Sequence, residues 1–333
     1  MSLQAGHTPS GSFIKPAFSA RLKAHLQIMR LDHSIKNIFV IPGIVVPLSV
    51  LRTPLLSRSL VWNILIGFLA TTLIACSNYV LNEVLDAPFD KLHPTKQNRP
   101  AAQGLINVPA AYAQWLFLMI AGIALGLTIS RLFAYTAGAL WIMGCLYNIP
   151  PIRTKDKVYL DVLSESFNNP LRMLLGWYMV TSVLVPPASL LICYWMTGCY
   201  LMALKRFSEC REIGDGQLAG SYRKSFRHYT EVSLLTSVTF YASAAMLFFG
   251  AFIIRYRIEL ILVFPLVALL MSTYFKLSFQ PHSAVQNPEK LYREPRLMIE
   301  AALISVLMVL LLYIDIPFLG WFFSPTMPSV LGR

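Results

Sequence analysis

Nine apolar segments, each close to the length of a membrane-spanning helix, constrain this chain more than any other feature. A helix needs about 20 mainly apolar residues to cross the hydrocarbon core of a bilayer. The segments cover residues 35–51, 60–85, 108–129, 132–149, 158–180, 187–207, 230–254, 258–278 and 297–316. Inside lipid the backbone must pair with itself, which a helix achieves within one segment. We therefore predict an all-α fold, a polytopic membrane helical bundle of about nine transmembrane helices.

The remaining composition fits that class of protein. Of the 333 residues, 56% are hydrophobic and 13% are charged, whereas soluble domains carry about 25% charged residues. Residues 1–33 lack an apolar core, so we expect no cleavable signal peptide there. We expect a mobile leader followed by a basic interfacial helix, roughly Phe18–Leu31. The transmembrane domain is predicted over residues 34–316, and residues 317–333 are predicted to form an extracytoplasmic tail.

The distribution of basic residues predicts the orientation of the bundle. Loops on one side of the nine predicted spans carry 20 of the 28 Lys and Arg residues, and loops on the other side carry 6. Because basic loops stay in the cytoplasm, we predict a multi-pass protein of the cytoplasmic (inner) membrane whose N-terminus is cytoplasmic. The same bias explains the net charge of +12, so we expect no nucleic-acid partner.

The first group of acidic residues lies at the cytoplasmic end of the second predicted span. Asn82, Asp86 and Asp90 follow the spacing i, i+4, i+8 and share one helix face, with Pro88 expected to bend or open the last turn. Like charges at this spacing repel, and Mg²⁺ would remove the conflict because it binds carboxylates together with substrate phosphates. Four candidate phosphate-binding side chains follow: Lys91, His93, Lys96 and Arg99. The alternative is a solvated loop with surface salt bridges.

A second charged group ends the sixth predicted span. Lys205, Glu209 and Glu212 share a helix face, beside Arg206. A basic run follows, with Arg223, Lys224 and Tyr229 among its members. Basic anchors at the membrane interface are the alternative for this run, although anchoring does not require the glutamates.

A third group lies within the fifth predicted span. Asp161, Glu165, Asn168 and Arg172 are spaced i, i+4, i+7, i+11 and form one polar stripe. Charged side chains within a span face the bundle interior, although a purely structural network is the alternative. Together the three groups predict a cytoplasm-facing polar cavity that contains carboxylates for a metal and bases for phosphate. Such a site suits the joining of a phosphorylated metabolite to a lipid.

With nine spans, the pattern Asn82-x-x-x-Asp86-x-x-x-Asp90 resembles the UbiA superfamily of intramembrane prenyltransferases. Most members carry a second aspartate-rich motif after the sixth helix, where this chain reads Lys-Arg-Phe-Ser-Glu over 205–209. That departure resembles the decaprenyl-phosphate phosphoribosyltransferase branch. The segments shared with this branch are Asp90-x-x-His93-Pro94-Thr95-Lys96-x-x-Arg99-Pro100, Lys205-Arg206-x-x-Glu209, Arg223-Lys224-Ser225 with Tyr229, Arg30 with Lys36 and Asn37, and Asp161 with Arg172.

The resemblance implies a catalytic domain over 34–316 that transfers 5-phosphoribose from its 1-diphosphate to a decaprenyl-type polyprenyl monophosphate. Pyrophosphate is released, and the product serves cell-envelope pentose synthesis. It implies a metal site for Mg²⁺ at Asn82, Asp86 and Asp90, with Lys205 and Glu209 also catalytic. The implied substrate-binding residues are Arg30, Lys36, Asn37, Lys91, His93, Lys96, Arg99, Asp161, Arg172, Arg206, Arg223, Lys224 and Tyr229.

Two other functions stay open from the sequence. The first is a conventional UbiA-type prenyltransferase that moves a prenyl group from prenyl diphosphate to an aromatic or other small acceptor. The second is a transporter or lipid-binding membrane protein without chemistry, against which the two carboxylates beside four bases argue. Expected partners are phosphoribose diphosphate, polyprenyl phosphate and the lipid bilayer, and a homo-oligomer is left open.

Overall fold

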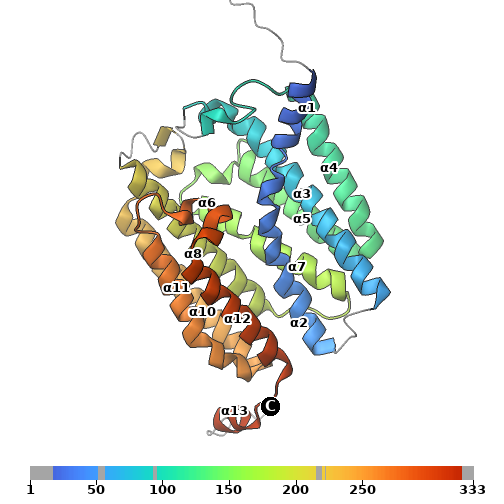
Figure 1. Ribbon diagram of the computed structural model, residues 1–333, viewed down its shortest axis with the longest axis vertical. Coiled ribbons are helices and arrows are strands. Elements are labelled where there is room, and N and C mark those ends of the chain that lie inside the picture. The colour runs from blue at the N-terminus through green and yellow to red at the C-terminus, as the bar shows by residue number, and fades with distance from the viewer. Residues whose placement is uncertain (1–17, 52–56, 93–95, 215–219, 222, 325–333) are drawn as a thin grey trace, which may run out of the picture.

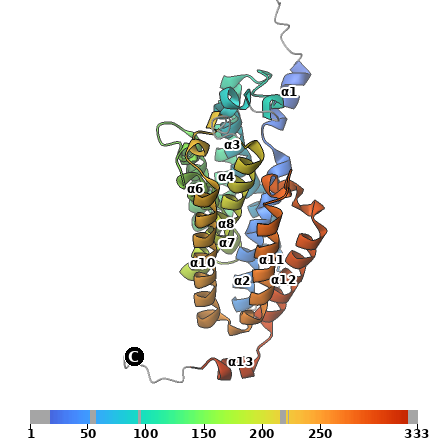
Figure 2. The same cartoon turned by 90° about the vertical axis from the view of Figure 1, so that its left-hand side faces the viewer.

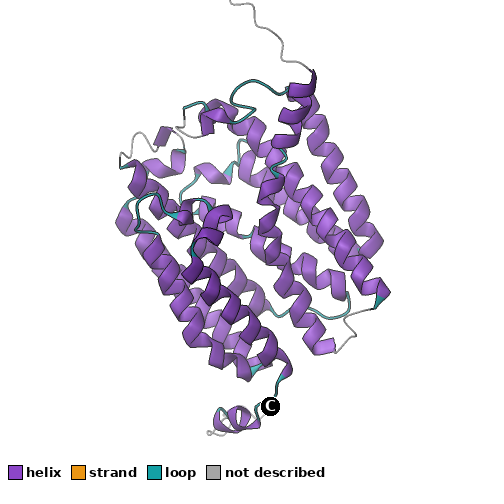
Figure 3. Cartoon of the chain, in the orientation of Figure 1, coloured by secondary structure: helices purple, strands orange, loops and turns teal. Residues whose placement is uncertain are grey.

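The computed structural model describes residues 18–51, 57–92, 96–214, 220–221 and 223–324, and within these ranges every regular element is a helix (Figure 3). The long helices are α3 (Arg58–Asp90), α4 (Val108–Ile129), α5 (Arg131–Asn148), α8 (Ala188–Ile213), α10 (Glu231–Tyr256), α11 (Phe264–Leu277) and α12 (Pro295–Tyr313). The shorter α-helices are α1 (Phe18–Gln27), α2 (Ile41–Leu51), α6 (Leu160–Ser166), α7 (Asn168–Val180) and α13 (Pro317–Phe322). The 3₁₀ helices are η1 (Leu31–Val40), η2 (Lys96–Asn98), η3 (Thr154–Asp156), η4 (Lys224–Arg227), η5 (Ile258–Val263), η6 (Ala284–Gln286) and η7 (Pro288–Arg293).

The predicted all-α membrane bundle is confirmed. In the described ranges, seven helical segments are long and apolar enough to cross a membrane, and each overlaps a predicted span, although the first, Ser19–Leu51, begins well before the predicted span 35–51. The two other predicted spans also fall on helix, one on α5 and one on α6 with α7. These two spans do not meet the same criteria of length and hydropathy. Polar residues at both ends of α5, Arg131 and Asn148, lower its mean hydropathy, and α6 and α7 are each too short.

The helices pack in two groups that lie side by side (Figure 1). One group contains α2, α3, α5 and α7 around a core that includes Ile74, Phe133 and Leu175, with α4 against α3. The other contains α8, α10, α11 and α12. Seen from the side, the long helices run roughly along the longest axis, with α1 toward one end and α13 at the other (Figure 2). Large apolar side chains such as Trp62, Phe117 and Phe240 are exposed on the outside, as expected of a surface that faces lipid.

Small residues bring the helices of the first group close together. A Cβ atom on Gly43 of α2 would lie 1.9 Å from the backbone oxygen of Met173, and one on Gly176 of α7 would lie 2.1 Å from that of Val40. Gly122 of α4 likewise permits close packing, because a Cβ there would lie 2.9 Å from Ile74 of α3.

The structure contradicts two local predictions, an opened turn at Pro88 and an unbroken helix over 158–180. Helix α3 continues through Pro88 to Asp90 rather than opening there. Near a C-terminus proline removes only one intrahelical hydrogen bond, and the Lys91 amide still donates to the Ala87 oxygen at 3.3 Å. The predicted span 158–180 is also broken at Phe167 into α6 and α7. Pro170 contributes to the break because it cannot donate a hydrogen bond to the last turn of α6.

Candidate active site

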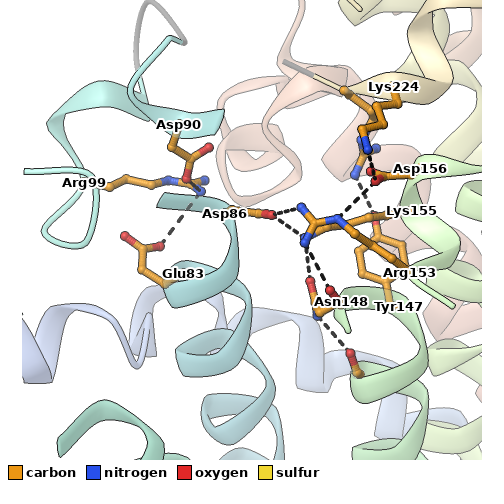
Figure 4. Close-up of polar contacts among 12 residues, drawn as sticks. Glu83, Asp86, Asp90, Arg99, Tyr147, Asn148, Arg153, Lys155, Asp156 and Lys224 are labelled. Atoms are coloured by element: carbon orange, nitrogen blue, oxygen red, sulfur yellow. Dashed lines mark hydrogen bonds and ion pairs between the residues drawn. The ribbon is translucent and has the colours of Figure 1, made fainter. Parts of the chain in front are cut away.

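The acidic residues of α3 lie at the end of the bundle formed by the C-termini of α3, α5 and α8, and they turn toward different bases (Figure 4). Asp86 Oδ1 accepts from Arg153 Nη2 at 2.9 Å and from Lys155 Nζ. Asp90 Oδ2 accepts from Arg99 Nη1 at 2.6 Å. The same guanidinium lies 3.9 Å from the buried carboxylate of Glu83. The predicted acidic face therefore exists, and each of its aspartates holds at least one base.

The two bases on Asp86 come from the loop between α5 and α6, which the sequence analysis did not include in the site. Asn148 ends α5 and holds both, because its backbone oxygen accepts from Arg153 Nη1 at 3.1 Å and its side chain accepts from Lys155 Nζ at 2.7 Å. Arg153 adopts a positive φ of 26°, and its Nε lies 3.2 Å from Asp156. Lys155 is only 3% exposed. Burial lowers the pKa of Lys155 to about 8, although nearby Asp86 opposes that change.

The sequence carried a weak signal for these residues. In the sequence, Arg153 and Lys155 served only as basic loop residues that support the predicted topology. A basic residue in a loop has the same sequence signature whether it lies at the membrane surface or is buried. In the structure, Arg153 and Lys155 differ from membrane-anchoring bases because both bind Asn148 at the end of α5. The sequence alone does not show that Asn148 has these partners.

Asp161 is fully buried, with 0% exposure, and all its partners come from the same end of the bundle. The Tyr229 hydroxyl donates to Oδ1 at 2.6 Å, and Oδ2 lies 3.2 Å from Arg206 Nε and 3.6 Å from Arg223 Nη1. The Ser225 hydroxyl also donates to Oδ2, at 3.4 Å. These contacts join α6, α8 and the segment before α10, so Asp161 holds two arginines in place.

The predicted Lys-Arg-x-x-Glu group of α8 lies beside Asp161. Arg206 Nη1 is 2.8 Å from Glu209 Oε2, while Lys205 Nζ is 4.0 Å from Glu209 Oε1. Arg223 Nη2 donates to the Tyr147 hydroxyl at 2.7 Å. The bases thus pair with two sets of acids, one formed by Asp86 and Asp90 and the other by Asp161 and Glu209.

One helical turn before Asp86, a polar cavity of about 60 Å³ is lined by residues of α3, α5, α6 and α7. Its lining includes Asn82, Glu165, Asn168 and Arg172. The side chains of these four make no hydrogen bond or ion pair with any residue that the structure describes, and the buried Arg172 Nε and Asn168 Oδ1 are unsatisfied. The predicted stripe is therefore divided, because Asp161 is fully paired and the other three members line the cavity.

The other predicted site residues lie around these features. Arg30 and Lys36 approach the ring of Tyr79, at 6.0 and 5.8 Å from its centroid, and Tyr79 also lines the cavity. Asn37 is buried and donates to Thr72 at 2.9 Å, a contact between η1 and α3. Lys91 is exposed.

Two further predicted residues, Lys224 and Lys96, belong to the loops of this end. Lys224 is exposed, with its Nζ 3.7 Å from Asp156. Lys96 is half-buried, and burial lowers its pKa. His93 lies outside the described residues. The structure therefore brings most of the predicted residues to one end of the bundle.

The residues present fit a magnesium ion that is bound together with a phosphate ligand. No cluster of three or more His, Cys, Asp or Glu side chains suited to a metal occurs in the described ranges. Asn82, Asp86 and Asp90 nevertheless offer one amide and two carboxylates along one helix face. Mg²⁺ is usually held by one or two carboxylates plus substrate phosphates. Beside them, Glu83 Oε1 is a buried acceptor without a hydrogen bond.

Comparisons with known proteins agree on the kind of protein. A family model described as the UbiA prenyltransferase family matches residues 40–298. A UbiA homolog from Archaeoglobus fulgidus, solved with DMAPP and Mg²⁺, superposes with a TM-score of 0.66 at 17% identity, covering 87% of this chain and 99% of that one. At this identity the likeness concerns the fold.

Two curated relatives match parts of the chain. The nodulation protein NoeC of Azorhizobium caulinodans is 25% identical over 186 residues, which is 55% of this chain and 58% of that protein. The decaprenyl-phosphate phosphoribosyltransferase of Corynebacterium glutamicum is 27% identical over 100 residues, 30% of this chain and 29% of that protein. The chain thus spans less than two thirds of the length of these relatives.

Proposed function

Because the chain belongs to the UbiA prenyltransferase family, we propose that it is a magnesium-dependent transferase that joins 5-phosphoribose to a polyprenyl monophosphate. The donor is 5-phosphoribose 1-diphosphate, and the acceptor is a lipid of the decaprenyl type. The product would supply pentose for the cell envelope. The catalytic domain covers residues 34–316, and the charge bias of the loops favours a site on the cytoplasmic side of the inner membrane.

One observation carries this proposal over prenyl transfer: the bases form two groups. Arg99, Arg153 and Lys155 surround the α3 aspartates, whereas Arg206 and Arg223 surround Asp161. Transfer of a prenyl group to an aromatic acceptor involves a single diphosphate. The proposed reaction involves a diphosphate, the donor's 5-phosphate and the acceptor phosphate, which need more than one basic region. The phosphoribosyltransferase relative supports the same choice.

The reaction is a displacement at C1 of the ribose. An oxygen of the ionised acceptor phosphate forms the new bond to C1 while the bond from C1 to the diphosphate breaks, and pyrophosphate leaves with the electron pair. No strong general base is required, because the acceptor is already an anion. Arg153 and Lys155 donate hydrogen bonds to the leaving group as its charge grows.

The other residues bind and orient the substrates. Arg206 and Arg223, fixed by Asp161 and Tyr147, bind the 5-phosphate or the acceptor phosphate through charge-assisted hydrogen bonds. Lys205 and Glu209 complete that region. Mg²⁺, held by Asn82, Asp86 and Asp90, would neutralise charge on the diphosphate.

The test uses the full chain in membranes with Mg²⁺, labelled phosphoribose diphosphate and polyprenyl phosphate. We expect a labelled lipid and free pyrophosphate. The second candidate, favoured by the family's description, is prenyl transfer to an aromatic or other small acceptor. No labelled lipid, together with product from a prenyl diphosphate and an aromatic acid, would establish that candidate instead.

A further inference from the structure

Two buried polar atoms inside the bundle, Asn168 Oδ1 and Arg172 Nε, have no hydrogen-bond partner, and the half-buried Asn82 and Glu165 lie beside them in one cavity. Asn82 comes from α3, Glu165 from α6, and Asn168 and Arg172 from α7, and all line the cavity of about 60 Å³. None has a hydrogen-bond or ion-pair partner among the described residues, and Arg172 is 7% exposed with its Nε unsatisfied. Buried polar groups in folded proteins are nearly always paired, so this arrangement calls for a ligand.

A purely structural role does not explain the arrangement. Asp161 belongs to the same sequence stripe and shows what a structural carboxylate looks like here, with both oxygens engaged. Glu165 and Arg172 have opposite charges and line one cavity, yet no ion pair within 4 Å joins them. The carboxylate of Glu165 and the guanidinium of Arg172 therefore leave space between them for a ligand that both donates and accepts hydrogen bonds.

The chemistry of the lining selects the class of ligand. An apolar chain would leave the carboxylate, the guanidinium and the amides without partners, which is costly. A phosphate could pair with Arg172, but it has no proton to donate to the carboxylate of Glu165 and would leave that acceptor without a partner. Hydroxyl groups suit the cavity, because each one both donates and accepts. A carboxylate with neighbouring amides accepts from adjacent hydroxyls, and the guanidinium donates to them.

The cavity lies next to the diphosphate region. Asn82 lines it and precedes Asp86 by one helical turn, about 6 Å along α3. Its volume holds only a few water-sized groups, which matches the hydroxyl-bearing edge of a sugar. A group attached to a diphosphate at Asp86 therefore reaches the cavity directly.

We infer that this cavity binds the ring hydroxyls of the donor's pentose, with Glu165 and Asn168 as its specificity-determining residues. The inference rests on the proposed function and names the part of the donor that each side chain recognises. Glu165 accepts hydrogen bonds from the hydroxyls, while Asn168 and Arg172 complete the pairing. The site therefore distinguishes a sugar diphosphate from pyrophosphate alone and from a prenyl diphosphate.

The test measures equilibrium binding to the purified full chain with Mg²⁺, using phosphoribose diphosphate and pyrophosphate as separate probes. Glu165→Gln should weaken phosphoribose diphosphate binding by about 10-fold or more, the size expected for hydrogen bonds to a charged group. Pyrophosphate affinity should not change. Asn168→Ala, which removes a second lining group, should act in the same direction.

A matched control is Glu300→Gln, since Glu300 pairs with Thr273 and Arg296 away from the cavity. This variant should bind both probes like the wild type. Thermal unfolding of each variant separates a binding defect from misfolding. If Glu165→Gln and Asn168→Ala both keep the wild-type preference for phosphoribose diphosphate over pyrophosphate, the inference is overturned and the proposed function stands. If the wild type itself shows no such preference but binds a prenyl diphosphate tightly, the proposed function fails, and this inference fails with it.

Discussion

At the scale of single residues, the carboxylate of Asp86 forms ion pairs with Arg153 and Lys155 and is also the proposed metal ligand. Asp86→Asn should abolish Mg²⁺-dependent binding of pyrophosphate, because a neutral amide cannot replace the charge of the carboxylate. Even outer partners of metal ligands change metal affinity by about 10- to 100-fold, and a ligand should do at least as much. Calorimetric titration measures the effect. The control is Asp156→Asn, which alters a neighbouring acid paired with Arg153 and Lys224. Unchanged Mg²⁺ dependence in Asp86→Asn would remove Asp86 from the metal site.

Asp161, also at this scale, is expected to contribute mainly to the stability of the fold rather than to direct contact with a substrate. Removing its charge leaves the guanidinium groups of Arg206 and Arg223 without their buried partner. Loss of one member of a buried ion pair costs about 3–5 kcal/mol, so Asp161→Asn should unfold at a clearly lower temperature than the wild type. Thermal unfolding in detergent measures this. A normal unfolding temperature combined with lost activity would instead make Asp161 a substrate ligand.

At the scale of elements, the contact between α2 and α7 depends on backbones that approach closely. Gly176→Ala places a methyl group 2.1 Å from the backbone oxygen of Val40, the last residue of η1 before α2, so α7 must move away from the segment formed by η1 and α2. Overpacking of this kind costs about 1–3 kcal/mol. The matched control is Gly138→Ala in α5, where a Cβ meets nothing within 4 Å. Thermal unfolding should show a lower midpoint only for Gly176→Ala, and equal midpoints would mean that α2 and α7 adjust without cost.

The helices also show how much of the fold and of the candidate site the sequence predicts. Apolar length predicts the spans well because the bilayer imposes it, and spacing on α3 predicts a shared acidic face. The break at Phe167 has no such periodic signal, and the stripe from Asp161 to Arg172 was therefore predicted to face one cavity. Lys155 was missed because its burial depends on packing between α3 and the α5–α6 loop, a contact between segments that lie far apart in sequence.

At the scale of the whole molecule, the orientation in the membrane decides which compartment supplies the donor. Helix α10 is 26 residues long, or about 39 Å, so its two ends reach opposite faces of a bilayer. Glu231 is exposed at the end that carries the proposed site, and Ser324 is exposed beyond α13. The basic loops predict that the first end is cytoplasmic, so the proposed sugar diphosphate donor would have to reach the site from the cytoplasm.

Labelling of single introduced cysteines tests this orientation. In a background without the five native cysteines, Ser324→Cys should react with a membrane-impermeant maleimide in intact cells. Glu231→Cys should react only after the membrane is opened, because its end of α10 is predicted to face the cytoplasm. Both positions are exposed, so a difference between them reports the side of the membrane rather than burial. The reverse labelling pattern would place the site on the outer face and would require the donor to be delivered there.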